Sequence, residues 1–256
     1  MFRCKFHCFV CVGLLLSSAA ALAQTTLHFN NIDDQTGWSS CSACAGGKNS
    51  SSNYSGPVKV FWPSLDGSSA KFSIKNPWPS YANVLWWKNQ LMGATDHSTI
   101  AGIHNITYDL YFYIKKPQAS QALEFDVTQT ICNSNPCTST STSTRYTYGT
   151  ECNRVDTGTW RVWNGGAWVS TGIPCSMQSF RWNHVVWQFQ RNTTTNQITF
   201  VSLTYNGATH YVNQTASPVT IQAPADDFNA DFQMDGNFKG NPYDTWLDKI
   251  NLTAWQ

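Results

Sequence analysis

The sequence predicts an all-β protein built as a sandwich of two packed antiparallel sheets. Runs rich in β-branched and aromatic residues alternate with Gly, Pro, Asn and Asp turn signals along the chain. No long segment keeps a helical period, and good helix formers are few, since Glu124 and Glu151 are the only glutamates. Many short strands without intervening helices are typical of two-sheet sandwiches.

The expected elements can be placed in order along the chain. A first strand is expected at Leu27–Ile32, followed by a Ser/Gly/Asn-rich loop over Gly37–Gly56. Asp66-Gly67 and Asn164-Gly165-Gly166 are turn candidates, and Asn206-Gly207 is a strong hairpin signal. The other strands are expected at Val58–Trp62, Ala70–Ile74, Asn83–Lys88, Ile106–Lys115, Ala122–Thr130, Thr144–Cys152, Thr159–Asn164, Ala167–Ser170, Asn183–Arg191, Ile198–Tyr205, Thr209–Gln214, Ala230–Asp235 and Thr245–Trp255.

Residues 1–23 have the pattern of a secretory signal peptide. Arg3 and Lys5 precede the apolar run Phe9–Leu16, and Ala21-Leu22-Ala23 resembles a cleavage site. We therefore expect an exported protein, extracellular or, in a bacterium, periplasmic, with one β-sandwich domain over residues 24–256. No later stretch reaches 18 unbroken apolar residues, so no membrane span is expected.

The charge of this domain favours an uncharged partner. Without Arg3 and Lys5, 14 basic residues face 15 acidic ones, a net charge of −1. No basic stripe is present, which excludes nucleic acid and anionic membranes as expected partners. A polysaccharide or oligosaccharide fits better, and we expect a monomer.

Six cysteines follow the signal segment, and an even number in an exported chain indicates disulfides. Six cysteines allow 15 pairings. The expected disulfides are the short loops Cys41–Cys44 and Cys132–Cys137, with Cys152–Cys175 joining two strands. Zinc at Cys41-x-x-Cys44 is the alternative, but no second C-x-x-C pair follows, so no metal site is expected there.

Alternation along the strands predicts polar faces that could bind a sugar. Glu124, Asp126 and Thr128 share one face of a strand whose other face is apolar. All 12 Trp lie in the expected domain, where their flat rings suit sugar stacking as well as core packing. If the polar faces belong to different sheets, they are ordinary solvated surfaces. The candidate ligand-binding residues are Asp109, Tyr111, Tyr113, Gln129, Tyr146, Tyr148, Gln188 and Gln233.

The segment from Glu124 to Gln129 resembles the active strand of concanavalin A-like glucanases, the family of laminarinases and lichenases. Their pattern is E-x-D-x-x-E, which implies a nucleophile, an assisting Asp and an acid/base on a concave strand. Glu124 and Asp126 match, whereas Gln129 replaces the last Glu and cannot give a proton. The resemblance implies a jelly-roll sandwich, to which the closing strand Trp246–Leu252 also conforms.

A catalytic acid, if there is one, must then come from elsewhere. Glu151 is one candidate, with a hydrogen-bonded loop anchor as the alternative role. Asp235 is the other, because residues 233–240 loosely resemble the acid-bearing strand end of jelly-roll endoglucanases; its alternative role is turn formation before Gly236. A glycosidase needs two carboxyl groups flanking the scissile bond.

The sequence gives weaker indications of two further types of site. Asp33-Asp34 could contribute to a structural Ca²⁺ site, with strand-end capping as the alternative, and no other cofactor is expected. Alginate lyases of a similar fold use a His/Tyr pair with Arg and Gln. His184, Tyr111 and Arg145 exist here without the recognisable motifs.

Three functions therefore remain open. The first is a lectin-like module that binds a neutral polysaccharide in a concave aromatic and acidic groove. The second is a glycoside hydrolase using Glu124, Asp126 and a relocated acid. The third is a structural or adhesion domain without a small ligand. The sugar, its linkage and glycosylation at the N-x-S/T sequons are not fixed by the sequence.

Overall fold

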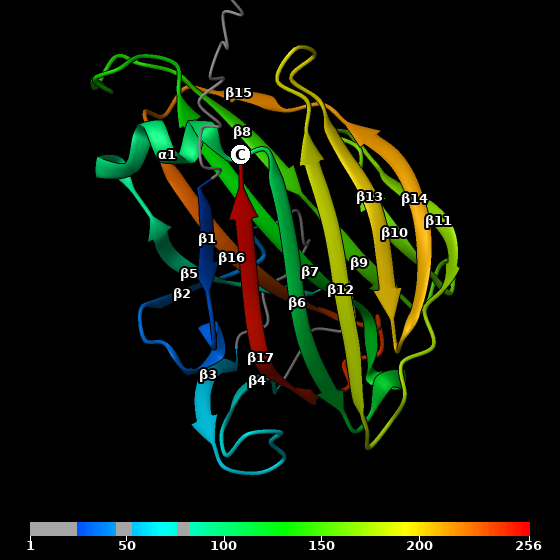
Figure 1. The fold of residues 1–256 in the computed structure, drawn as a ribbon. Helices are drawn as coiled ribbons and strands as arrows, with labels where there is room; N and C mark the ends of the chain where they lie inside the picture. Colours follow the sequence, from blue (N-terminus) through cyan, green and yellow to red (C-terminus); the bar gives the residue numbers. More distant parts are fainter. Residues whose placement is uncertain (1–24, 45–52, 76–81) are drawn as a thin grey trace, which may run out of the picture.

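A computed structural model describes residues 25–44, 53–75 and 82–256, and shows two antiparallel sheets packed face to face (Figure 1). One short helix, α1 (His97–Gly102), lies at one end of the sandwich. The expected signal peptide lies outside the described residues. No helix in these three ranges is long and apolar enough to cross a membrane.

Each sheet is named here for a central strand. The β6 sheet has the order β14-β13-β12-β6-β17-β4-β3, and β1 also pairs with β17. Its strands are β1 (Thr26–Phe29), β3 (Tyr54–Val60), β4 (Ser69–Ile74), β6 (Asn105–Ile114), β12 (Trp182–Arg191), β13 (Ile198–Tyr205), β14 (Ala208–Ala216) and β17 (Tyr243–Trp255).

The β7 sheet has the order β11-β10-β9-β7-β16-β5-β2, and β8 pairs with both β7 and β15. Its strands are β2 (Trp38–Ser42), β5 (Asn83–Met92), β7 (Ser120–Cys132), β8 (Ser143–Tyr148), β9 (Thr150–Asn153), β10 (Thr159–Trp163), β11 (Trp168–Pro174), β15 (Val219–Ile221) and β16 (Asp227–Gly236). Three-residue 3₁₀ turns occur at Ile32–Asp34, Ala94–Asp96 and Pro117–Ala119.

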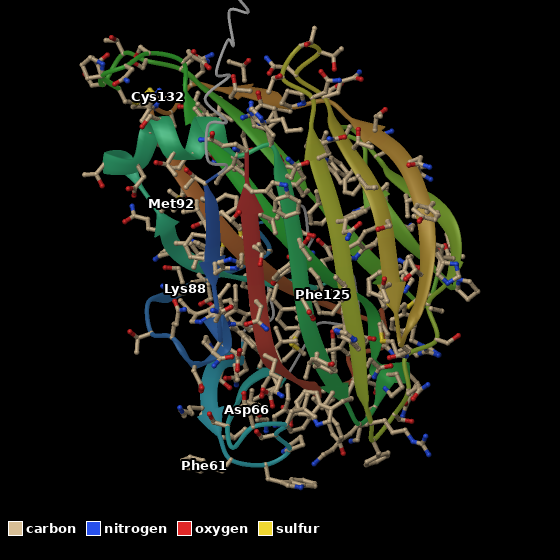
Figure 2. The ribbon with its side chains drawn as sticks, in the orientation of Figure 1. Phe61, Asp66, Lys88, Met92, Phe125 and Cys132 are labelled. Atoms are coloured by element: carbon tan, nitrogen blue, oxygen red, sulfur yellow. A yellow bond between two sulfur atoms is a disulfide. The ribbon has the colours of Figure 1, made fainter. Side chains whose placement is uncertain are left out.

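The core lies between the two sheets and is rich in aromatic rings. Phe125 of the β7 sheet packs on Phe112 of the β6 sheet with ring centroids 5.3 Å apart, and Phe232 meets Phe72 at 4.9 Å. Figure 2 labels Phe125 near the middle of the molecule, and its side chain is fully buried. These contacts join alternate residues of facing strands, as period-2 alternation requires. The predicted all-β, jelly-roll sandwich of two antiparallel sheets is confirmed.

Several boundaries differ from the expected ones for local reasons. The expected strand Thr144–Cys152 is divided into β8 and β9 at Gly149, where an added Cβ would meet Trp163 Cβ at 2.9 Å. The expected loop Gly37–Gly56 contains β2 and the start of β3. The Asn206-Gly207 hairpin joins β13 and β14, with positive φ at both residues.

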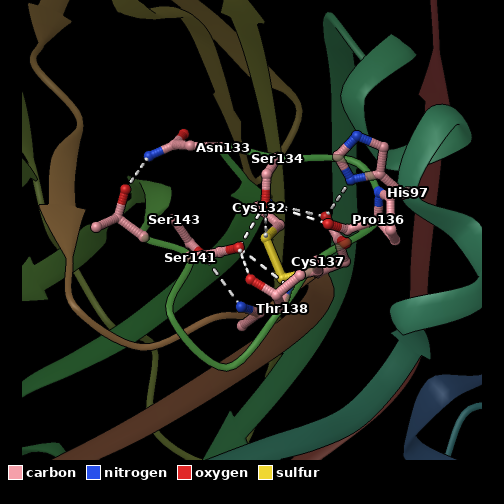
Figure 3. The surroundings of a disulfide bond; sticks show 12 residues. His97, Cys132, Asn133, Ser134, Pro136, Cys137, Thr138, Ser141 and Ser143 are labelled. Carbon is pink, nitrogen blue, oxygen red and sulfur yellow. Dashed lines mark hydrogen bonds and ion pairs between the residues drawn. A yellow bond between two sulfur atoms is a disulfide. The ribbon is translucent and has the colours of Figure 1, made fainter.

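Two of the three expected disulfides are present. Cys152–Cys175 links the end of β9 to the segment after β11, and Cys132–Cys137 closes a short loop (Figure 3). The expected Cys41–Cys44 bond is wrong for this structure, in which both thiols are free. Cys41 is fixed in β2 opposite Leu85, and the chain turns at Ala43, with φ of 60°, before it reaches Cys44.

Candidate functional site

Cross-strand register gathers polar side chains on the face of the β7 sheet that points away from the β6 sheet. Glu124 of β7 lies opposite Gln233 of β16, and Asp126 lies opposite Asp231. Directly opposite residues of paired strands point to the same side. Since Phe125 and the other intervening residues enter the core, these four polar side chains share the outward face.

This face contains a groove of about 240 Å³. Its floor carries the carboxylates and amide of β7 and β16, and Trp163 of β10 and Trp168 of β11 contribute aromatic rings. The two Trp are direct cross-strand partners, with ring centroids 5.6 Å apart at 67°. The groove is lined by Leu85, Glu124, Asp126, Thr128, Thr147, Gly149, Trp163, Trp168, Asp231 and Gln233.

Beside the groove, on the same face of the β7 sheet, lies a compact cluster of carboxyl groups. Oxygen atoms of Glu124, Glu151 and Asp235 all lie within 4.8 Å of one another. Gln233 Nε2 donates hydrogen bonds to Glu124 Oε1 at 2.5 Å and to Asp235 Oδ1 at 3.0 Å. Glu151 forms an ion pair with Arg161. Three carboxylates this close could bind one cation, although Arg161 already offsets the charge of Glu151.

Burial and mutual repulsion make these carboxyl groups hard to ionise. Burial, followed by the charges of Asp235, Asp126 and Glu151, raises the pKa of Glu124 well above its ordinary value. Burial also raises the pKa of Glu151, opposed by its hydrogen bond and ion pair with Arg161. The environment of Glu124 therefore favours the protonated form over the charged one, a property that suits a general acid.

The other two carboxyl groups on the groove floor are similarly perturbed. Burial raises the pKa of Asp126 well above its ordinary value, although the backbone N–H of Thr150 donates to Asp126 Oδ1 at 2.7 Å. Burial raises the pKa of Asp231 to about 7, opposed by a 2.7 Å hydrogen bond from the Thr128 hydroxyl. Burial therefore disfavours the charged form of both carboxyl groups.

The four carboxylates proposed as catalytic from the sequence thus gather on one face of the β7 sheet, but only two of them line the groove. These two are Glu124 and Asp126. Glu151 and Asp235 are each 1% exposed and do not line it. Both lie beside Glu124, and their charges help to raise its pKa. Gln233, proposed as a ligand-binding residue, lines the groove as expected of that role.

Three of the proposed ligand-binding residues point into the core. Gln129 is fully buried and donates from Nε2 to the carbonyl of Ile100 at 2.6 Å, while its Oε1 accepts from the Tyr148 hydroxyl. Tyr148 and Tyr146 are buried too, with the Tyr146 hydroxyl bonded to Asn196. Strand β7 pairs with β16 without a bulge from residue 123 to residue 130. Gln129 therefore faces the core, as the odd-numbered residues Phe125 and Val127 do. The expected place of these three candidates in the groove is wrong.

Four other candidates lie on the β6 sheet, on the opposite side of the sandwich. Asp109 pairs with His184 at 2.7 Å, and Tyr111 stacks on that imidazole with ring centroids 4.1 Å apart. Tyr113 packs on Trp182 and Trp246. Gln188 is exposed and accepts a hydrogen bond from Ser202. These residues cannot share the groove, because β6 and β12 belong to the other sheet.

The same separation corrects the expectation based on alginate lyases. Arg145 is in β8 of the β7 sheet, whereas Tyr111 and His184 are in the β6 sheet. The two acidic residues considered for Ca²⁺ already have protein partners. Asp33 accepts from the backbone of Ile250, and Asp34 pairs with Lys59 at 2.9 Å.

The groove also contains residues that were not singled out from the sequence. Alternation had placed Asp231 with Gln233 and Asp235 on one polar face, so its position was available as a signal. Trp163 and Trp168 had no comparable signal, because the order of strands decides which rings border the acidic strands. Thr147 and Gly149 line the groove for the same reason.

No model of a known protein family matches this chain, and no curated protein matches it. Several solved structures are similar to it, among them the following three. "Cellulose induced protein, Cip1" has 9% identity and a TM-score of 0.44 over 88% of this chain and 96% of that chain. Basic winged bean lectin with Tn-antigen has 14% identity and a TM-score of 0.42 over 90% of this chain and 98% of that chain. Alginate lyase Aly36B has 12% identity and a TM-score of 0.42 over 89% of this chain and 96% of that chain. All three are distant in sequence, and each is a likeness of overall architecture.

Proposed function

We propose that the groove on the β7 sheet binds a polysaccharide chain of neutral sugars. The observation that carries this proposal is the pairing of Trp163 and Trp168 with a floor of carboxylate and amide groups in one pocket. Aromatic rings stack on the CH-rich faces of sugars, and carboxylates and amides accept or donate hydrogen bonds with hydroxyl groups. The lining of the groove holds no Lys or Arg that would bind a negatively charged sugar.

We also propose that the protein is exported. Two disulfides suit an oxidising compartment, in which such bonds form and persist. A polysaccharide outside the cell is the matching partner. Detection of the chain in the culture medium or periplasm, with a mature N-terminus near Gln24, is the expected result.

Affinity electrophoresis against β-glucan, mannan and galactan tests the binding proposal. Trp163→Ala and Trp168→Ala should each reduce the retardation of the protein by its sugar. Tyr211→Ala, which removes a 79% exposed ring outside the groove, is the matched control and should leave retardation unchanged. Absence of retardation by all three classes of polysaccharide would end the proposal.

Glycoside hydrolysis is a second candidate, favoured by the raised pKa of Glu124. Glu124 would protonate the leaving-group oxygen as the glycosidic C–O bond breaks. Asp231 would accept a proton from the water that attacks the anomeric carbon. The two residues are diagonal neighbours on paired strands, so their backbone positions are about 7–8 Å apart and both carboxyl groups point to the same side. Inverting glycosidases separate their carboxyl groups by about 6.5–9.5 Å.

Two variants separate hydrolysis from binding. Glu124→Gln should abolish reducing-sugar release while binding persists. Asp235→Asn should move the alkaline limit of activity to lower pH, because it removes the neighbouring charge that helps to raise the pKa of Glu124. Unchanged turnover in Glu124→Gln would reject the catalytic role and leave the binding groove intact.

A further inference from the structure

A second pocket, of about 250 Å³, lies on the β6 sheet where β4 and β6 end and β17 begins. Its lining is Ile74, Lys75, Lys115, Lys116, Pro242, Tyr243, Asp244 and Trp246. It shares no lining residue with the groove, which is built from the other sheet.

The pocket carries an excess of positive charge. Among the residues that the structure describes, Lys75, Lys115 and Lys116 form no salt bridge with a carboxylate. The carboxylate that lines the pocket, Asp244, is already paired with Lys71 at 2.8 Å and with the Ser73 hydroxyl at 2.6 Å. Three ammonium groups without a counter-charge create a local field that favours an anion.

Aromatic rings adjoin these lysines. Lys115 Nζ lies 4.9 Å from the ring centroid of Trp246 and 5.1 Å from that of Trp62. Trp246 is nearly buried, whereas Trp62 is 70% exposed in the loop between β3 and β4. Figure 2 shows this loop, marked by Phe61 and Asp66, at the end of the molecule away from Cys132. An exposed ring next to a cationic pocket can stack on a sugar while the lysines hold its charged group.

We propose that this pocket binds a saccharide unit bearing an anionic group, either a uronate carboxylate or a sulfate ester. Lys75, Lys115 and Lys116 would hold the anion, and Trp62 would stack on the adjoining ring. The lining of the groove holds no Lys or Arg to bind the same unit. The protein would then bind two classes of sugar on opposite sheets, and this site does not depend on the function proposed for the groove.

Calorimetric titration of the full chain tests this site with three oligosaccharides of equal length: a polyuronate, a sulfated galactan and an uncharged galactan. We expect at least one anionic probe to bind, more weakly as salt rises. Lys115→Gln/Lys116→Gln should weaken that binding about tenfold or more, because it removes two charge-assisted contacts. The anionic probe that binds more tightly identifies the chemical group.

Matched variants distinguish the pocket from general surface charge. Lys88→Gln removes a cation from the other sheet and should leave binding unchanged. Lys116→Gln alone, at an exposed position, should weaken binding several-fold without disturbing the Trp contacts of Lys115. Equal affinity for charged and uncharged probes, or equal losses in Lys88→Gln and the double variant, would overturn the proposal. So would binding to phosphatidylserine vesicles but to neither anionic oligosaccharide.

Discussion

Replacing Asp231 by Asn should stabilise the protein at about pH 8 and change its stability little at about pH 4. Asp231 is 7% exposed, and burial raises the pKa of its carboxyl from 3.8 to about 7. A carboxyl whose pKa is higher in the folded than in the unfolded chain opposes folding when charged. This destabilisation is complete above about pH 7, decreases as pH falls through 7, and is absent below about pH 3.8.

The size of the effect follows from the separation of the two pKa values. Each pH unit between them corresponds to ~1.36 kcal/mol. Charged Asp231 therefore costs the fold roughly 4 kcal/mol at about pH 8. Asn has nearly the same shape, its carbonyl can still accept from Thr128, and it carries no charge at any pH.

Urea unfolding followed by tryptophan fluorescence at several pH values between about 4 and 8 measures this difference. Asp66→Asn, which neutralises an exposed carboxylate in a surface turn, is the control and should give a small difference throughout. A stability gain in Asp231→Asn that is the same at every pH would refute the electrostatic reasoning. A pH-dependent gain of equal size in the control would refute it as well.

Three other predictions address the groove, the core and a cross-link. Trp163→Ala and Trp168→Ala should each weaken the binding of a neutral oligosaccharide about tenfold in fluorescence titrations, the loss of ~1.4 kcal/mol of stacking; unchanged affinity in both would remove the rings from the site. Gln129→Glu, which restores the third acidic residue of the glucanase pattern, should destabilise the protein by about 3–5 kcal/mol in urea and create no activity, because it buries a charge against carbonyl oxygens; a stable, newly active variant would contradict this. Replacing Cys152 and Cys175 by Ala should cost about 3 kcal/mol of unfolding free energy, since their bond closes a loop of 23 residues, and a loss below ~1 kcal/mol would contradict the loop-entropy reasoning.

Strand alternation was enough to predict which side chains leave the core. Glu124, Asp126 and Gln233 alternate with buried apolar residues, so a period of two fixes their face once the strand is recognised. The same alternation placed Asp109 and Tyr111 on a polar face correctly. It could not assign that face to a sheet, because pairing between residues more than a hundred positions apart sets the strand order.

Three residues expected in the groove face the core, and for Gln129 strand alternation predicts this. Gln129 has the same parity as Phe125 and Val127, so alternation places it inside. It was expected in the groove because it occupies the last position of the glucanase pattern. Tyr146 and Tyr148 are amphipathic, and each buries its ring while the hydroxyl finds a partner in the interior. Such residues satisfy a core position and a binding position equally well in sequence.

The position of β17 has a consequence for how the chain is made. This strand follows all the others in sequence, yet it pairs with β6 on one side and with β4 and β1 on the other. Until residues 243–255 leave the ribosome, the partners of β17 have open edges, which favour pairing with other chains. Synthesis that stops before this segment should therefore yield aggregates, and chaperones that shield strand edges should matter most until these residues are made.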